Sequence, residues 1–380
     1  MSPKIAIVGA GPAGLALASI LCRNGITPTV FESDASPTAR PQGGSLDLHP
    51  ATGQAALAAC GLTPQFEKYA RYDGQDFILS DKKGNRLFEI KDQETGRPEI
   101  DREQLRRILL DSIPEGVIRW GQHLVSATQD TLQFKEGHSE SGFDLIVGAD
   151  GAWSKIRPLC CYVNPFYSGI TGVEMTLRET STKHPELSKT VGNGSFFAFA
   201  SEDGRVLQFQ RNDNDTIKCY AFMRKPDNWA KNSGIDWQDP QSIRASLKSD
   251  YADWTPELSR VIEEFDGTAA VRPLYTLPPI LRWPSQKKVT IIGDAAHLMT
   301  PFAGEGVNIA LADAMNLAKE IIAHPDDIAG AIHEAEVKMW DGAKDAAALA
   351  WENTLLRYEP GGLEKTMERV TTMLKKLDEH

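Results

Sequence analysis

Three glycines near the N-terminus, Gly9, Gly11 and Gly14, have the G-x-G-x-x-G spacing of a dinucleotide-binding turn. They stand between a short apolar run, residues 5–8, and an apolar helical pattern over residues 15–22. Between a strand and a helix, the first glycine allows a tight turn, the second admits a pyrophosphate and the third permits close helix packing. The helix N-terminus then offers free N–H groups to phosphate oxygens.

An acidic residue, Glu32, ends the second apolar run of the chain, residues 27–31. In dinucleotide-binding folds, an acidic residue at the end of the second strand binds a ribose hydroxyl. The glycines and Glu32 together predict a dinucleotide site, whereas the glycines alone would also fit an ordinary turn of an α/β protein.

Two later segments also place polar residues directly after apolar runs. DLIVGADGAWSKIR contains Asp150, and GDAAHLMTPFAGEGVN runs from Gly293 to Asn308. Taken alone, Asp150 with its following glycine fits an ordinary turn, and Asp294 fits a helix cap. The second segment is more specific, because its proline-containing loop leads through two glycines into a long helical pattern. The N–H groups at that helix start favour negative charge, such as the charge on one edge of a reduced flavin.

Composition limits the class of protein. The chain has 380 residues and a net charge of −11, which argues against a nucleic-acid partner. Its five cysteines form no C-x-x-C and no zinc spacing, so we expect no metal site and a reducing, cytoplasmic setting. No apolar run reaches the length of a membrane span, and the N-terminus leads directly into a strand without room for a signal peptide.

The elements expected around these motifs form an interleaved α/β fold. We predict a Rossmann-like domain with a parallel sheet from residues 1–65, 101–165 and 268–325, and an antiparallel-sheet substrate domain from residues 66–100 and 166–267. A C-terminal helical segment, residues 326–380, is expected to bridge the two domains. Helical patterns cover residues 51–60, 101–112, 238–265, 306–322, 330–357 and 361–379. Six alternating aromatic residues should divide between a core and a pocket roof: Phe196, Phe197, Phe199, Phe209, Tyr220 and Phe222.

The three motifs, in this order and spacing across residues 1–325, resemble the signatures of the FAD-dependent group A aromatic hydroxylases. PQGGSLDLHPATGQAAL, PEIDREQLRRILL and the third motif are similar to the tetracycline-inactivating flavin monooxygenases. The similarity fades over residues 166–267, where a substrate would be held.

The resemblance implies a bound, non-covalent FAD. It assigns Glu32 to the adenosine ribose, Leu124 to the adenine side, Asp150 to both FAD and NADPH, and Asp294 to the ribityl chain. Ser33 stands where the relatives tend to carry Arg. The implied cofactor-binding residues are Gly9, Gly11, Pro12, Ala13, Gly14, Glu32, Ser33, Arg40, Asp47, Arg102, Leu124, Asp150, Asp294, Pro301, Gly304, Gly306, Val307 and Asn308. Arg106, four residues after Arg102, fits a solvated basic helix face, and His297 fits a structural role.

The implied activity is that of a monooxygenase consuming NADPH and O2. Through a C4a-peroxyflavin, it would hydroxylate a tetracycline or a similar polycyclic phenol or enol, with no side chain as nucleophile. NADPH should bind transiently, because the chain has no second glycine-rich fingerprint. A biosynthetic hydroxylase of another aromatic substrate, a non-oxygenating FAD reductase and a flavin sensor are the alternatives. Nothing in the sequence requires more than a monomer.

Overall fold

The computed structural model describes residues 2–39, 43–74, 76–90, 96–135, 137–357 and 361–378, and the chain divides into two compact units. Unit 1 comprises Met1–Ala70, Ile100–Phe166 and Tyr275–Trp351, and unit 2 comprises Arg71–Glu99, Tyr167–Leu274 and Glu352–His380. The predicted α/β fold class is confirmed. The domain boundaries and the bridging role of the C-terminal helices stay predictions.

Unit 1 is built on a five-stranded sheet in the order β17-β11-β1-β2-β7, in which every neighbouring pair is parallel. Its strands are β1 (Ile5–Val8), β2 (Thr29–Phe31), β7 (Ile118–Arg119), β11 (Leu145–Gly148) and β17 (Val289–Ile291). The central strands β1 and β11 are buried along their whole length. Parallel strands covered on both faces require such continuous apolar runs, which is why the sequence shows them.

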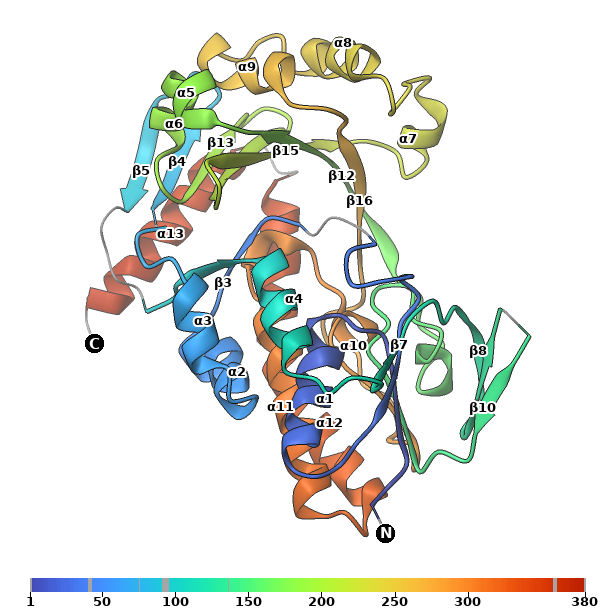
Figure 1. Ribbon diagram of the computed structural model, residues 1–380. Helices are drawn as coiled ribbons and strands as arrows, with labels where there is room; N and C mark the ends of the chain where they lie inside the picture. The colour runs from blue at the N-terminus through green and yellow to red at the C-terminus, as the bar shows by residue number, and fades with distance from the viewer. Residues whose placement is uncertain are drawn as a thin grey trace. The chain divides into compact units, whose positions relative to one another are not determined.

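Helices pack on this sheet and on one another (Figure 1). The helix α1 (Pro12–Arg23) begins at the glycine-rich turn and contacts α4 (Arg102–Asp111) and α11 (Gly306–Ala323). The remaining elements of unit 1 are β3 (Ser45–Asp47), η1 (Pro50–Gln54), α2 (Ala55–Ala59), α3 (Thr63–Tyr69), β8 (Leu124–Ala127), β9 (Thr131–Phe134), β10 (Ser139–Ser141), η2 (Arg157–Leu159), α10 (Asp294–His297) and η3 (Pro301–Ala303). Among the described elements, four include residues of both units: β6 (Glu99–Asp101), β12 (Phe166–Leu177), β16 (Ala270–Thr276) and α12 (Ile328–Leu356).

Unit 2 is built on a seven-stranded sheet in the order β16-β12-β15-β14-β13-β4-β5. Its strands are β4 (Phe77–Asp81), β5 (Arg86–Ile90), β12 (Phe166–Leu177), β13 (Ser195–Phe199), β14 (Val206–Asn212), β15 (Thr216–Arg224) and β16 (Ala270–Thr276). Adjacent strands from β12 to β13 pair antiparallel, but β13 pairs with β4 in parallel. The exception has a physical reason: β4 comes from an earlier chain segment, so no short hairpin fixes its direction.

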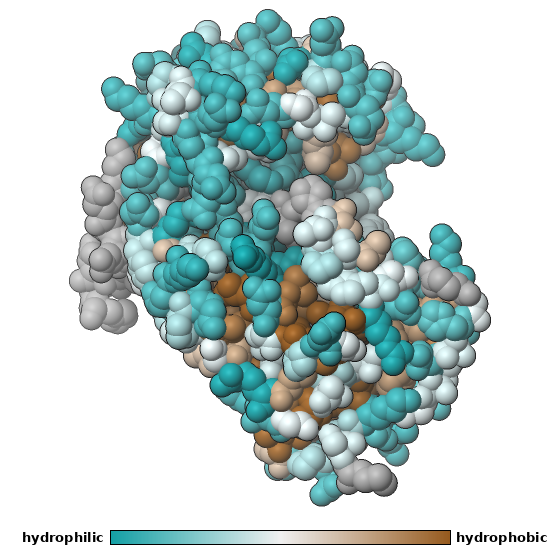
Figure 2. Space-filling model, in the orientation of Figure 1, coloured by the Kyte–Doolittle hydropathy of each residue, from teal (hydrophilic) through white to brown (hydrophobic). Residues whose placement is uncertain are grey.

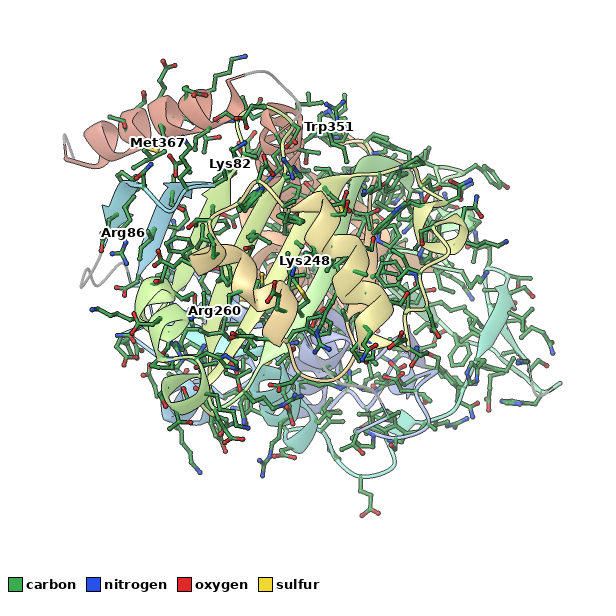
Figure 3. All side chains as sticks on the ribbon, turned by 90° about the horizontal axis from the view of Figure 1, so that it is seen from above. Lys82, Arg86, Lys248, Arg260, Trp351 and Met367 are labelled. Carbon is green, nitrogen blue, oxygen red and sulfur yellow. The ribbon has the colours of Figure 1, made fainter. Side chains whose placement is uncertain are left out.

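Two amphipathic helices, α8 (Pro240–Asp250) and α9 (Pro256–Glu264), cover one face of this sheet, as Figure 3 shows. Their apolar residues, including Leu247 and Leu258, join the core of unit 2, while the outer surface over both helices is mainly hydrophilic (Figure 2). The helical pattern over residues 238–265 is divided between these two helices, with a break between Asp250 and Pro256. The other helices of unit 2 are α5 (Thr180–Lys183), α6 (Pro185–Val191), α7 (Trp229–Asn232) and α13 (Gly362–Asp378).

The aromatic residues of unit 2 divide between the two faces of the sheet. Phe196 and Phe209 are fully buried in the core. Phe197 and Tyr220 alternate with core residues along β13 and β15, so they lie on the opposite face and are only half-buried. That face therefore carries aromatic surface which the core does not use.

Candidate active site

The glycine-rich turn between β1 and α1 leaves space at one glycine only. Gly9 has a φ of +104°, and a Cβ there would lie 2.3 Å from the carbonyl oxygen of Ala149. A Cβ on Gly14 would lie 2.1 Å from the carbonyl oxygen of Gly9. Gly11, in contrast, has no atom within 4 Å of where its Cβ would be. Two glycines thus serve packing, and the open space at Gly11 fits a ligand backbone such as a pyrophosphate.

The carboxylate of Glu32 is buried and holds this turn from the end of β2. Its Oε2 accepts a 2.6 Å hydrogen bond from the backbone N–H of Ala10. Its Oε1 accepts hydrogen bonds from the N–H of Asp34 at 2.8 Å and from the Ser33 hydroxyl at 3.0 Å. A carboxylate has about four acceptor positions, so room remains for one ribose hydroxyl.

Arg106 differs from its expected place on a solvated face. It is buried on α4, and its Nη1 donates a 2.5 Å hydrogen bond to the carbonyl oxygen of Ala10. Its guanidinium also lies 5.9 Å from the Trp120 ring centroid and 3.6 Å from Asp34. Arg106 therefore binds the carbonyl oxygen of Ala10, and Glu32 binds the N–H of the same residue. Together they fix the turn from both sides.

The segment after β11 presents a buried carboxyl oxygen. Oδ2 of Asp150 accepts a 2.7 Å hydrogen bond from the N–H of Lys155. Oδ1 of Asp150 is buried and has no hydrogen-bond partner within the described ranges. Burial raises the pKa of this carboxyl above its ordinary value, although hydrogen bonds from Ser154 and Lys155 oppose that shift. An unsatisfied buried acceptor is costly unless a ligand supplies a donor, so Oδ1 is a fitting contact for a bound cofactor.

Arg157 ties the second motif to the third. Its buried guanidinium donates 2.7 Å hydrogen bonds to the carbonyl oxygens of Ala152 and Ala295, and a longer one of 3.3 Å to that of Asp294. The two loops are thereby held by one cation. No sequence motif identifies Arg157, since its partners are backbone groups that leave no pattern of residue types.

A buried carboxylate on α11, Asp313, organises the start of the third motif. Its Oδ2 accepts a 3.0 Å hydrogen bond from the N–H of Gly293 and lies 2.5 Å from Nε2 of His297. Burial lowers the pKa of His297, but the Asp313 carboxylate outweighs this effect and the pKa is raised. One ring nitrogen of His297 is thus held by Asp313 inside the protein. A Cβ on Gly293 would lie 3.4 Å from Cβ of Ala13, which places the third motif beside the first.

Asp294 begins α10, and solvent reaches its side chain. The surrounding protein limits its hydration and raises the pKa of its carboxyl, whereas the charges of His297, Arg102 and Arg157 lower it. Arg102 is exposed at the start of α4, and its Cδ would lie 2.9 Å from a Cβ on Gly43. Both residues are accessible to a ligand.

The loop before α11 packs against the turn after β3. Nδ2 of Asn308 donates a 2.9 Å hydrogen bond to the carbonyl oxygen of Asp47, and its Oδ1 accepts one of 2.9 Å from the N–H of His49. The ring of His49 lies between two carboxylates, 2.9 Å from Asp47 and 3.3 Å from Glu305. These hydrogen bonds raise the pKa of His49 to about 9. The structure therefore brings Asp47 and Asn308 together.

The N-terminus of α11 is open to a ligand. Glu305, the residue before the helix, makes no capping hydrogen bond with its side chain. The first N–H groups of a helix have no partner within it, so those of Gly306, Val307 and Asn308 can bind a negatively charged ring edge. Gly304 has a φ of +71°, and at Gly306 no atom lies within 4 Å of an added Cβ. Pro301 begins η3 immediately before them.

The other predicted residues occupy simpler positions. Pro12 and Ala13 form the first turn of α1, Ser33 is exposed beside Glu32, and Leu124 begins β8. Arg40 lies outside the described residues. Within the described ranges, no group of three or more His, Cys, Asp or Glu side chains could hold a metal ion. Nor does any described helix have the length and apolar character to cross a membrane.

The FAD binding domain family matches residues 3–331 of the chain. The chain belongs to this family. Among curated proteins, this flavoprotein is 32% identical to Monooxygenase penA of Penicillium thymicola, covering 95% of this chain and 97% of the relative. It is 33% identical to Monooxygenase asqM of Emericella nidulans, covering 93% and 95%. The predicted enzyme class, an FAD-dependent monooxygenase, is confirmed.

Solved structures share the fold of this flavoprotein. Klebsiella pneumoniae HpxO, complexed with FAD and uric acid, has a TM-score of 0.77 at 22% identity, covering 99% of this chain and 93% of that one. The tetracycline destructase Tet(51) has a TM-score of 0.71 at 20% identity, covering 99% and 98%. The resemblance drawn from the motifs is thus confirmed for family and fold.

The residues present fit FAD. The space at Gly11, the unsatisfied oxygen of Asp150 and the open helix start at Gly306 are three features that a dinucleotide with a charged ring system would fill. FAD is therefore the cofactor of this flavoprotein.

Proposed function

We propose that this flavoprotein uses NADPH and O2 to hydroxylate a polycyclic phenol or enol, with a tetracycline as the first compound to test. The open N-terminus of α11 carries this proposal, because its N–H groups stand beside the turn formed by Asp47 and His49. When bound, FAD supplies the redox chemistry that activates O2. The protein binds and orients the flavin, stabilises negative charge with the dipole of α11 and excludes water.

The individual residue roles belong to this proposal. Gly9 and Gly14 shape the turn in which Gly11 meets the pyrophosphate, and Asp294 holds the ribityl chain. The loop from Pro301 to Asn308 lines the flavin ring. NADPH binds transiently, which is supported by the single glycine-rich fingerprint. No side chain acts as a nucleophile.

The half-buried face of the unit 2 sheet is the proposed substrate surface. Its aromatic rings include Phe77 and Phe197, with centroids 5.2 Å apart. An ion pair of 2.6 Å between Lys218 and Glu174 lies on the same face, because both residues alternate with core positions. Aromatic rings with a few polar groups suit a planar, polar-substituted polycycle.

A biosynthetic hydroxylase of another aromatic compound is the second candidate. The identity of 32–33% to two fungal monooxygenases favours it. Mass spectrometry after aerobic incubation with NADPH and a tetracycline separates the candidates. A product one oxygen atom heavier, absent without NADPH, supports the first proposal. If the tetracycline is unchanged while FAD stays bound, the result favours another phenol as the substrate.

We also propose a monomeric, cytoplasmic enzyme whose residues 326–380 bridge the two domains. All five cysteines lie in described ranges and none forms a disulfide there, which is consistent with a reducing compartment. Deletion of residues 330–380 tests the bridge. We expect loss of activity, and a fully active truncated enzyme would refute that role.

A further inference from the structure

Unit 1 contains a cavity that shares α10 with the FAD-binding segments and is otherwise lined by residues outside them. It measures about 270 Å³, near the lower end of the usual range for small-molecule pockets. The segment 278–283, between β16 and β17, forms one wall. α10 and the part of α12 around Met339, Trp340 and Ala343 complete it.

Two buried ring nitrogens at this cavity have no hydrogen-bond partner in the described part of the chain. They are Nδ1 of His297 and Nε1 of Trp340. His297 is more than nine-tenths buried, and its other nitrogen, Nε2, is held by Asp313. Nε1 of Trp340 is a donor without an acceptor, which is a costly state that a ligand oxygen would relieve. The Asp313 carboxylate raises the pKa of His297, which favours a ring that can also donate from Nδ1.

The walls are aromatic, and the rim carries two cationic side chains, Arg282 and Lys344. The rings of Trp283 and Trp340 meet edge to face, with centroids 5.5 Å apart. Arg282 lies over the Trp340 ring at 5.6 Å and pairs with Asp341 at 2.8 Å. Lys344 is exposed at the rim and has no ion-pair partner within the described ranges. Among described residues, the lining includes no carboxylate.

From this cavity, its two unpaired ring nitrogens and its rim cations, we infer a second binding site, separate from the flavin, for a planar aromatic anion such as an aromatic carboxylate. The ring would lie against Trp283 and Trp340, and the carboxylate would accept hydrogen bonds from His297 and Trp340. Lys344 would attract the anion. The site does not depend on which substrate the enzyme hydroxylates.

Isothermal titration of the FAD-loaded enzyme with 2-naphthoate tests this site. Ala343→Phe fills the cavity from α12 and should abolish binding. Asp345→Phe adds the same ring to the same helix at an exposed position outside the lining, so binding should persist. Trp340→Phe removes one donor and keeps the ring stacking, and should weaken binding by about tenfold.

Lys344→Gln is a second variant that should fold normally, because Lys344 is exposed. It should weaken binding of 2-naphthoate by about threefold. Circular dichroism and FAD content check that Ala343→Phe folds. The inference is overturned if the parent enzyme gives no binding heat, or if folded Ala343→Phe binds 2-naphthoate as tightly as the parent. Equal affinity for the neutral 2-naphthamide would refute the preference for an anion.

Discussion

Arg106 on α4 donates a hydrogen bond to the carbonyl oxygen of Ala10 in the glycine-rich turn, although 96 residues separate the two in sequence. Glu32 binds the N–H of the same residue. The turn is therefore fixed before any cofactor arrives, so its binding does not have to order the loop. Such preorganisation increases affinity by lowering the entropy cost of binding.

Replacing Arg106 with Met should weaken FAD binding. The substitution keeps an apolar stem but removes the charged donor, and hydrogen bonds to charged groups contribute about 1.5–3 kcal/mol. We expect the dissociation constant for FAD to rise by about tenfold or more in fluorescence titration of the apoprotein. Arg107→Met is the matched control, because Arg107 is exposed. Equal effects of both substitutions would contradict the role of Arg106.

The pKa of His49, raised to about 9, predicts a pH dependence of stability. A histidine whose pKa is higher in the folded state than in the unfolded state stabilises the folded protein. This stabilisation is complete below the ordinary pKa of about 6.5 and is lost as the pH rises toward 9. Because His49 is partly exposed, we expect a loss of about 1–2 kcal/mol. Urea unfolding of the apoprotein at pH 6.5, 7.5 and 9 measures it.

His49→Asn should flatten that profile, since the ionising ring is gone. The control His324→Asn changes an exposed histidine and should leave the profile as steep as in the parent. A profile of unchanged slope in His49→Asn would show that Asp47 and Glu305 do not stabilise the charged ring.

Local sequence signals predicted much of the fold of unit 1. Buried parallel strands appear as continuous apolar runs such as residues 5–8, and glycines mark the turns that follow. The pattern at residues 306–322 predicted α11 to within a residue. Pairing between distant segments leaves no such signal, so the parallel contact of β13 with β4 was not predicted.

The residues of the candidate site likewise divide into those that a local motif identifies and those that depend on distant contacts. Gly11, Asp47 and Asn308 could be named from motifs, because their spacing within a short segment is distinctive. Arg106 and Asp313 could not, since each is a charged residue buried by partners far away in the sequence. Charged residues at helical spacing are normally solvated, so only the tertiary structure distinguishes these two.

Asp294→Ala should give largely colourless protein. The proposed role of Asp294 is to bind the ribityl chain, and removing the acceptor leaves ligand hydroxyls unpaired. The ratio of flavin to protein absorbance after purification measures retained FAD. Glu334→Ala removes an exposed carboxylate from α12 as a control and should stay yellow. Full flavin content in Asp294→Ala would refute the assignment.

Phe197→Ala should raise the KM for an aromatic substrate without changing FAD content. Phe197 is half-buried on the face of β13 opposite the core, so its removal leaves little cavity in the core. Loss of one aromatic contact costs about 0.5–1.5 kcal/mol, which predicts an increase in KM of about threefold to tenfold. Leu87→Ala, at an exposed site on β5, is the control. An unchanged KM would mean that substrate binds elsewhere.

The buried pair of Asp313 and His297 should be strongly coupled. Removing one partner of a buried ion pair leaves an uncompensated charge and costs about 3–5 kcal/mol. Asp313→Ala should therefore destabilise the protein severely, and adding His297→Ala should cost less than the sum of the single changes. In urea unfolding, we expect a coupling energy of about 1–3 kcal/mol. The exposed pair of Lys248 and Glu263, 2.8 Å apart, is the comparison and should couple only weakly. Additive effects at Asp313 and His297 would mean that Asp313 stabilises the loop through Gly293 alone.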